Sequence, residues 1–450
     1  MNQSVSGITP VSSAERLATP DILRGFALMG ILLMNIVGMG LHPASYTDPT
    51  AHGGSSGVNL WVYIINAILA DGKMRGLFSM LFGAGIILFA ARAERRDAGV
   101  LAADLYYRRT IWLMLFGIAH AFLFWFGDIL FPYALCGLFL FPFRKLAPRG
   151  LIIAGALFLV GLTAASVFQA FEIERLRANA AAAEAARATG QTLTEEQEEA
   201  RKQWSEKLKF LKPDAAEIQK AENDFRGGFL AALKRRASIV LMWHSMPIYS
   251  PLFWDMFGMM LTGMALLKLR FLTGECSNRV YLATAIAGYA AGLPLHAFLV
   301  WRDVSFGFDS VNMHFSAIGY QPASVAVCLA HVSVVVLAIK SGVLSWLTSR
   351  LAAAGQMAFS NYIAQSVITA FVFCGFGLGL YGTLERHQLY YVVLAIWTFQ
   401  LAWSPVWLRR FRFGPLEWAW RSLAYWQRQP MGLSERRPAV VGIPVSQAEG

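Results

Sequence analysis

Residues 20–36 read PDILRGFALMGILLMNI, an apolar run that opens a membrane helix. One end of the run carries an acid and a base three residues apart, Asp21 and Arg24. A charge inside hydrocarbon costs free energy, so such a pair is a candidate functional site. The alternative interpretation is that Arg24 extends to the lipid headgroups while Asp21 caps the helix.

The composition indicates a membrane protein throughout the chain. Hydrophobic residues make up 56% of the 450 residues and charged residues 15%, whereas soluble domains carry about 25% charged residues. Repeated apolar runs therefore predict an all-α, polytopic bundle of about ten transmembrane helices. The expected spans are 21–41, 72–91, 108–125, 128–143, 150–171, 251–269, 279–300, 320–339, 360–381 and 388–408.

The net charge of +11 comes from basic loops between the expected spans, and successive crossings put these loops on the same side of the membrane. Arginines cluster in 92–109, in 144–149 and in the tail after Arg409, whereas the loop 42–57 has neither Lys nor Arg. The positive-inside rule then predicts that both termini are cytoplasmic, and no nucleic-acid partner is needed to explain the charge. The cluster at 234–236 falls on the other side, next to a long insertion where the rule is weak.

The expected spans and the positions of the charged residues divide the chain into four segments. They are N-terminal membrane helices (1–171), an extracytoplasmic helical insertion (172–228), C-terminal membrane helices (229–426) and a cytoplasmic tail (427–450). The insertion is rich in alanine and in charged residues, which is typical of a solvated helical surface. Three further stretches are expected at the membrane surface rather than across it, namely 58–71, 229–246 and 343–357.

His120 and Asp128 are the first candidates for chemistry, because polar residues within membrane spans are few. A histidine in the apolar run around 111–130 is either a hydrogen-bonded core residue or a functional group. Asp128 either caps the following helix or orients a histidine. Eight residues put the pair on one helix face but about 12 Å apart along the axis, so no direct contact is expected in a straight helix.

The segment 72–85 carries Lys73, Arg75 and Ser79 at the expected outer boundary. The two cations either extend to the headgroups or bind an anionic group of a substrate or lipid. Gly83 and Gly85 suit close helix packing. In the ninth span, Asn361 and Gln365 share a face, where they either join two helices or line a site.

Histidines on the outer side include His42 and His52, but the chain has no HxH or HxxxH pair. Ligand pairs at such spacings are typical of zinc sites, so no metal is expected. The four cysteines lack CxxC spacing, and we expect them to be unreactive core thiols.

Six blocks resemble, in order, the YeiB-like family of bacterial inner-membrane proteins. They read PDILRGFALMGILLMNI, GKMRGLFSMLFGAG, GIAHAFLFWFGDILFPYALCG, MAFSNYIAQS, FGFGLGLYG and RFRFGPLEWAWR. The resemblance implies a multi-pass protein of the bacterial inner membrane. It also suggests a wider relation to membrane acyltransferases, which share a first-helix Asp-x-x-Arg-Gly motif that Asp21, Arg24 and Gly25 match.

This chain matches the residue pattern of the membrane acyltransferases only in part. In the sugar O-acyltransferases a histidine follows the motif arginine by eleven residues, and here that position is Asn35. The related heparan enzyme has an asparagine there and uses a histidine of the following outer loop, where this chain has His42 and His52. The YeiB-like pattern contains the residues matched by His120 and Asp128, so His120 ranks first as the base.

Three interpretations of the function follow from these residues. The first is an acyltransferase that moves an acyl group from a cytoplasmic, acyl-CoA-like co-substrate to a hydroxyl or amine of a glycan, lipid or small molecule, with no tightly bound cofactor. The alternative is a transporter for a small anionic metabolite, since His, Asp and Arg within spans suit proton coupling. A non-catalytic membrane partner is the third interpretation, and membrane lipids are partners in all three.

Overall fold

The computed structural model describes residues 17–95, 99–245, 248 and 250–433. Its elements, in chain order, are α1 (Ala18–Gly40), η2 (Pro43–Tyr46), α2 (Gly57–Leu69), α3 (Lys73–Arg95), α4 (Gly99–Leu123), α5 (Leu130–Leu140), η3 (Phe141–Lys145), α6 (Pro148–Ala188), α7 (Glu195–Leu211), α8 (Ala215–Arg226), α9 (Phe229–His244), α10 (Pro251–Lys268), α11 (Asn278–Ser305), α12 (Ser310–Ser341), α13 (Ser345–Gln356), α14 (Ala358–Phe373), α15 (Arg386–Leu408) and α16 (Pro415–Ala424). The prediction of an all-α fold is confirmed, since the described residues contain only one isolated β-bridge, between Phe411 and Gly432.

Local sequence explains where several helices begin. The Ser250 hydroxyl accepts a hydrogen bond from Leu252 N, and Pro251 follows at the first helical position of α10. Thr194 and Gln197 form a reciprocal capping box at the start of α7. These caps satisfy backbone N–H groups that a helix end otherwise leaves unpaired.

Each predicted span overlaps a helix, and the membrane character of the chain is confirmed. Within the described residues, six helical stretches are long and apolar enough to cross a membrane: Ala18–Gly40, Gly57–Arg95, Pro148–Ala188, Asn278–Ser305, Ser310–Ser341 and Arg386–Leu408. The number of ten crossings and the cytoplasmic placement of both termini stay predictions. Of the tail, residues 434–450 lie outside the described part of the chain.

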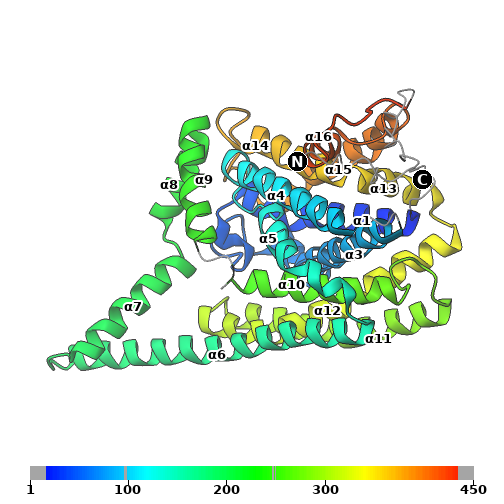
Figure 1. Ribbon diagram of the computed structural model, residues 1–450. Helices are drawn as coiled ribbons and strands as arrows, with labels where there is room; N and C mark the ends of the chain where they lie inside the picture. The colour runs from blue at the N-terminus through cyan, green and yellow to red at the C-terminus, as the bar shows by residue number, and fades with distance from the viewer. Residues whose placement is uncertain (1–16, 96–98, 246–247, 249, 434–450) are drawn as a thin grey trace, which may run out of the picture.

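The helix that opens the sequence is central to the bundle. The apolar window of α1 is 72% buried, whereas that of α6 is only 11% buried. In Figure 1, α1 and α3 lie in the interior of the bundle, with α4 and α5 on one side of them and α10 and α12 on another. The α1 helix is therefore surrounded by protein, and α6 is left to face lipid.

Glycines let the inner helices approach closely. A Cβ atom on Gly83 of α3 would lie 2.0 Å from the backbone oxygen of Met260, and one on Gly263 of α10 would lie 2.0 Å from that of Met80. Gly83 therefore packs as the sequence predicts, whereas a Cβ on Gly85 would meet nothing within 4 Å. Small residues are the usual means of close backbone contact between membrane helices.

The insertion continues the fifth predicted span without a break. Helix α6 runs past residue 171 to Ala188, and α7 folds back beside it, so that α6 and α7 form an arm that projects from the bundle (Figure 1). Helix α8 then returns to the bundle. The predicted boundary at residue 171 thus lies inside a helix.

Candidate functional site

The first-helix pair forms as an ion pair. Arg24 Nη1 lies 2.6 Å from Asp21 Oδ1, with the Asp21 side chain 11% exposed and that of Arg24 28% exposed. The adjacent Gly25 lets α13 pack directly on this turn, because a Cβ there would lie 2.0 Å from Leu351 O. The pair therefore sits where α1 meets α13, and Arg24 opens onto a cavity.

This Arg24 cavity has a volume of about 270 Å³. Three arginines line it, Arg24, Arg109 and Arg421, together with the carboxylate of Glu417, and the remaining lining is mainly apolar and aromatic. The Arg109 guanidinium lies over the Trp420 ring, 4.6 Å from its centroid, which holds the cation at the cavity edge. A cavity of this kind suits an amphiphile with an anionic head.

A second space, the Asp128 cavity, has a volume of about 520 Å³ and brings together three predicted residues, Asn35, Arg75 and Asp128. Arg75 is fixed there by Asp255, with Nη2 3.0 Å and Nε 3.1 Å from the same carboxylate oxygen. Gln321 Nε2 donates to the other oxygen of Asp255 at 2.6 Å. The cation is thus paired, and one wall of the cavity is rigid.

His120 and Asp128 are in direct contact, which corrects the expectation that they lie too far apart. His120 Nδ1 lies 2.7 Å from Asp128 Oδ1, with side chains 1% and 0% exposed. The expectation assumed a continuous helix, but α4 ends at Leu123 and the chain turns back before α5. Asp128 Oδ2 also accepts a hydrogen bond from Phe131 N at 2.7 Å, so it caps α5 as well.

A residue far along the chain stabilises this turn. Arg236 of α9, 1% exposed, donates to the backbone oxygens of Phe122 and Leu123. These carbonyls belong to the last turn of α4 and have no partner within the helix, so a buried cation suits them. Sequence reasoning placed 234–236 at the membrane surface and missed this role.

The histidine lies in the wall between the two cavities. Asp128 and Ile129 line the Asp128 cavity, and Ile129 N donates to the hydroxyl of Tyr362 at 3.1 Å. Tyr362 lines the Arg24 cavity, and its ring centroid lies 5.1 Å from that of His120. His120 itself lines neither cavity, and its Nε2 has no hydrogen-bond partner among the described residues.

Ser79 belongs to the same wall. Its hydroxyl lies 2.7 Å from that of Tyr133, and Tyr133 also donates to the backbone oxygen of Arg75 at 3.1 Å. Tyr133 and Tyr362 were not predicted as site residues. The sequence could have indicated Tyr362, because it follows the predicted residue Asn361. Only the fold shows that Tyr362 is the residue of this pair that faces His120.

Three other predicted residues lie elsewhere. Lys73 is fully buried, and its Nζ donates to Ala67 O at 2.7 Å. Asn361 Nδ2 donates to Ser404 at 3.0 Å, and Gln365 Nε2 donates to Gln400 at 3.0 Å. The two amides therefore face α15, and none of the three residues lines the Arg24 or the Asp128 cavity.

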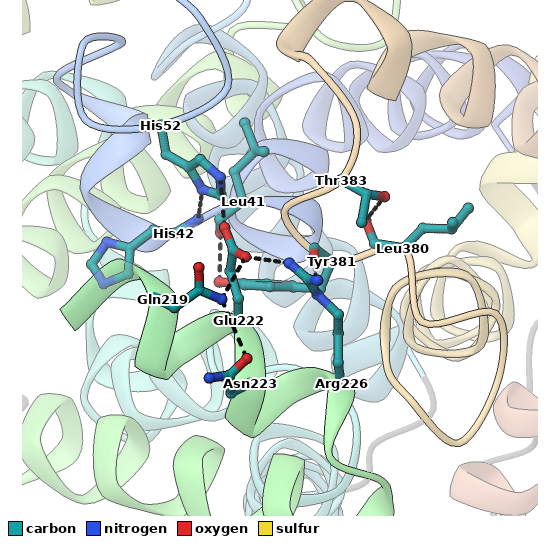
Figure 2. Close-up of polar contacts among 10 residues, drawn as sticks. All are labelled: Leu41, His42, His52, Gln219, Glu222, Asn223, Arg226, Leu380, Tyr381 and Thr383. Atoms are coloured by element: carbon teal, nitrogen blue, oxygen red, sulfur yellow. Dashed lines mark hydrogen bonds and ion pairs between the residues drawn. The ribbon is translucent and has the colours of Figure 1, made fainter. Parts of the chain in front are cut away.

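His42 and His52 lie where the loop after α1 meets the insertion. His52 Nδ1 accepts a hydrogen bond from His42 N at 3.2 Å, and His52 Nε2 lies 3.1 Å from Glu222 Oε1. Figure 2 shows Glu222 between His52 and Arg226, and Arg226 Nε donates to the Tyr381 carbonyl at 2.8 Å. Burial lowers the pKa of His42 to about 4 and also lowers the pKa of His52. His42 Nδ1 accepts a hydrogen bond from Ala44 N at 3.2 Å, so both imidazoles are held by structural contacts.

No group of three His, Cys, Asp or Glu side chains suitable for a metal ion occurs in the part of the chain that the structure describes. The four cysteines are free, and three of them are buried.

Comparison with known proteins gives a family but no structural relative, since no solved structure matches. Residues 266–427 match the family described as "Protein of unknown function (DUF418)". The chain is 30% identical over 431 residues to the uncharacterized protein YeiB of Escherichia coli (strain K12), covering 91% of this chain and 96% of that protein. It is 29% identical over 447 residues to the uncharacterized protein YxaH of Bacillus subtilis (strain 168), covering 95% and 98%. The chain belongs to the YeiB-like family of membrane proteins.

Proposed function

We propose that this protein is a membrane acyltransferase in which His120 is the general base. The observation that supports this most directly is the 2.7 Å contact between His120 Nδ1 and Asp128. A carboxylate only accepts hydrogen bonds, so Nδ1 carries the proton and Nε2 is left with its lone pair. An acid that orients a histidine in this way is a recurring device of acyl transfer.

The two cavities suit two substrates. An acyl thioester of the acyl-CoA class places its phosphates at Arg24, Arg109 and Arg421 and its acyl chain among the aromatic side chains of the Arg24 cavity. The acceptor, a hydroxyl or amine of a glycan, lipid or small molecule, occupies the Asp128 cavity. His120 lies between them, within the wall.

The chemical step balances without a metal or redox cofactor. His120 Nε2 takes the proton from the acceptor O–H or N–H while the acceptor atom attacks the thioester carbonyl. The tetrahedral intermediate collapses, the C–S bond breaks, and the thiolate takes the proton from His120. Asp128 stabilises the imidazolium that forms between the two proton transfers.

Reaction requires the wall to open. Because His120 is 2% exposed and Tyr362 lies against it, the Tyr362 side chain has to move before Nε2 meets substrate. The closed wall keeps water from the thioester until both substrates are bound. We place the enzyme in the bacterial inner membrane, with about ten spans and both termini cytoplasmic, in line with its bacterial relatives.

Transfer of label from radioactive acyl-CoA, measured with protein in nanodiscs, tests the mechanism. His120→Gln is expected to abolish transfer, and His314→Gln is the matched control, since His314 Nδ1 contacts the Ser310 carbonyl four residues earlier and His314 lines neither cavity. Retained transfer in His120→Gln overturns the role of His120.

The second candidate is a transporter for a small anion. It is favoured by the Arg75–Asp255 pair, which places charge inside the bundle at the edge of a cavity. Counterflow of a labelled anion in proteoliposomes, without any acyl product, would support transport instead.

A further inference from the structure

A third cavity adjoins the proposed acceptor space. This Arg386 cavity has a volume of about 320 Å³ and shares Met34, Tyr46, Thr47 and Asp71 with the lining of the Asp128 cavity. The two cavities therefore have part of their walls in common.

The charges that line this cavity are of both signs and are not paired with one another. Arg386, Asp71 and Asp303 line it, and none of them forms an ion pair within 4.0 Å with a residue that the structure describes. Arg386 is only 2% exposed. A buried guanidinium without a counter-charge is costly. The carboxylates of Asp71 and Asp303 are half-buried, and Asp303 accepts a hydrogen bond from the Ser316 hydroxyl at 2.6 Å. A ligand that supplies both opposite charges would pair all three groups around this one small space.

Arg386 is held in place for such a ligand. Its Nη2 donates to the Ser45 carbonyl at 2.8 Å, its backbone N donates to the Gly53 carbonyl at 2.8 Å, and its guanidinium lies 5.5 Å from the centroid of Tyr63. These contacts fix the side chain but neutralise none of its charge. A preorganised guanidinium loses little entropy when it binds a phosphate or a carboxylate.

The same lining offers a free acceptor. Asn66 Nδ2 donates to the Leu33 carbonyl at 3.1 Å and contacts the hydroxyl of Tyr390 at 2.9 Å, which orients the amide. Asn66 Oδ1 is then buried without a hydrogen-bond partner among the described residues. An unpaired buried acceptor favours a donor group on the ligand.

We infer that the Arg386 cavity binds a zwitterionic group of the phosphoethanolamine class, with its phosphate at Arg386 and its ammonium at Asp71 and Asp303. A simple dianion would meet two carboxylates, and a simple amine would meet the guanidinium, so only a group with both charges pairs every partner. That this group is part of the acceptor rests on the proposed function, in which the rest of the acceptor extends past Asp71 to the Asp128 cavity. That the cavity binds such a group does not depend on the proposed function.

Binding of labelled O-phosphoethanolamine, measured by equilibrium dialysis of the full chain without acyl donor, tests the inference. We expect it to bind at least about tenfold more tightly than ethanolamine or inorganic phosphate, because each of these lacks one of the two charge-assisted contacts. Equal binding of inorganic phosphate overturns the inference. Because no acyl donor is present, a failure of acyl transfer leaves this result unaffected.

Two variants locate the site. Arg386→Gln and Asp303→Asn each keep a hydrogen-bonding side chain and are expected to weaken binding by about tenfold or more. Arg177→Gln is the control, because Arg177 pairs with Asp309 near the surface. Unchanged binding in both site variants contradicts the inference, and should either variant misfold, the selectivity of the unmodified chain among the three probes still decides.

The source of the group is settled by competition. Nanodiscs of phosphatidylethanolamine that displace the labelled probe, where phosphatidylglycerol discs do not, assign the site to a lipid headgroup. Displacement by soluble O-phosphoethanolamine alone assigns it to a free metabolite. Displacement by phosphatidylglycerol as effective as that by phosphatidylethanolamine contradicts the need for an ammonium.

Discussion

His120 and Asp128 meet at 2.7 Å although eight residues separate them, because α4 stops three residues after His120 and the chain doubles back. The turn is held from outside by Arg236, which contacts the last carbonyls of α4. The dyad therefore depends on the packing of α9 against α4, and the proposed base is positioned by a segment more than a hundred residues away.

Asp128→Asn is expected to lower kcat for acyl transfer about 10²–10⁴-fold with little change in KM, since the amide no longer stabilises the imidazolium. Steady-state kinetics in nanodiscs measure both constants. Asp104→Asn is the matched control, because Asp104 pairs with Arg108 and is 53% exposed. A fall in KM equal to that in kcat would argue against a role in the chemical step.

Arg24→Gln is expected to raise the KM for the acyl donor by about tenfold, the loss that follows when one charged contact to a phosphate is removed. It should leave the KM of the acceptor unchanged, because Arg24 lines only the donor cavity of the two. Initial rates with each substrate varied in turn separate the two effects. A change confined to the acceptor would reverse the assignment of the cavities.

Gly83→Val is expected to destabilise the protein by about 3 kcal/mol or more, because the new side chain would meet the Met260 backbone and not a mobile side chain. The readouts are the melting temperature in detergent and the monodisperse fraction after purification. Gly161→Val is the control, since a Cβ there meets nothing within 4 Å. Equal stability of the two variants would show that α3 and α10 are not packed through this glycine.

Acidification is expected to loosen the contact between α8 and the loop that follows α1. Burial lowers the pKa of His42 from 6.5 to about 4 and lowers the pKa of His52, so the undocked loop binds protons that the docked loop does not. Stability from these contacts is therefore complete above pH 6.5 and falls as the pH decreases toward 4. Arg226 and Arg386 add to the cost of protonating His52, and Glu222 opposes it.

Hydrogen exchange of Ala215–Arg226 at pH 7.5 and pH 5 measures this effect. After correction for the intrinsic pH dependence of amide exchange, we expect lower protection at pH 5 than at pH 7.5 in the unmodified chain. The difference should be smaller in His52→Gln, which has no imidazole at position 52. An identical pH difference in both proteins would rule out His52 as the group responsible.

Apolar run length was enough to predict the helical bundle, and i, i+4 spacing was enough to put Asn361 and Gln365 on one face. What these amides contact was not predictable, because their partners, Ser404 and Gln400, lie on another helix. The end of α4 is the clearest case. Residues 121–126 stay apolar to the turn, so no local signal stops the helix, and the buried cation that caps it lies in α9.

The continuous α6 helix is a single long element that joins the arm to the membrane bundle. At 1.5 Å per residue, its 41 residues extend about 62 Å, roughly twice the hydrocarbon thickness of a bilayer. Its membrane half touches α10 at Gly155, where a Cβ would lie 2.9 Å from Thr262, and two turns earlier in α10 Asp255 holds Arg75. A continuous series of helix contacts thus joins the arm to the rim of the Asp128 cavity.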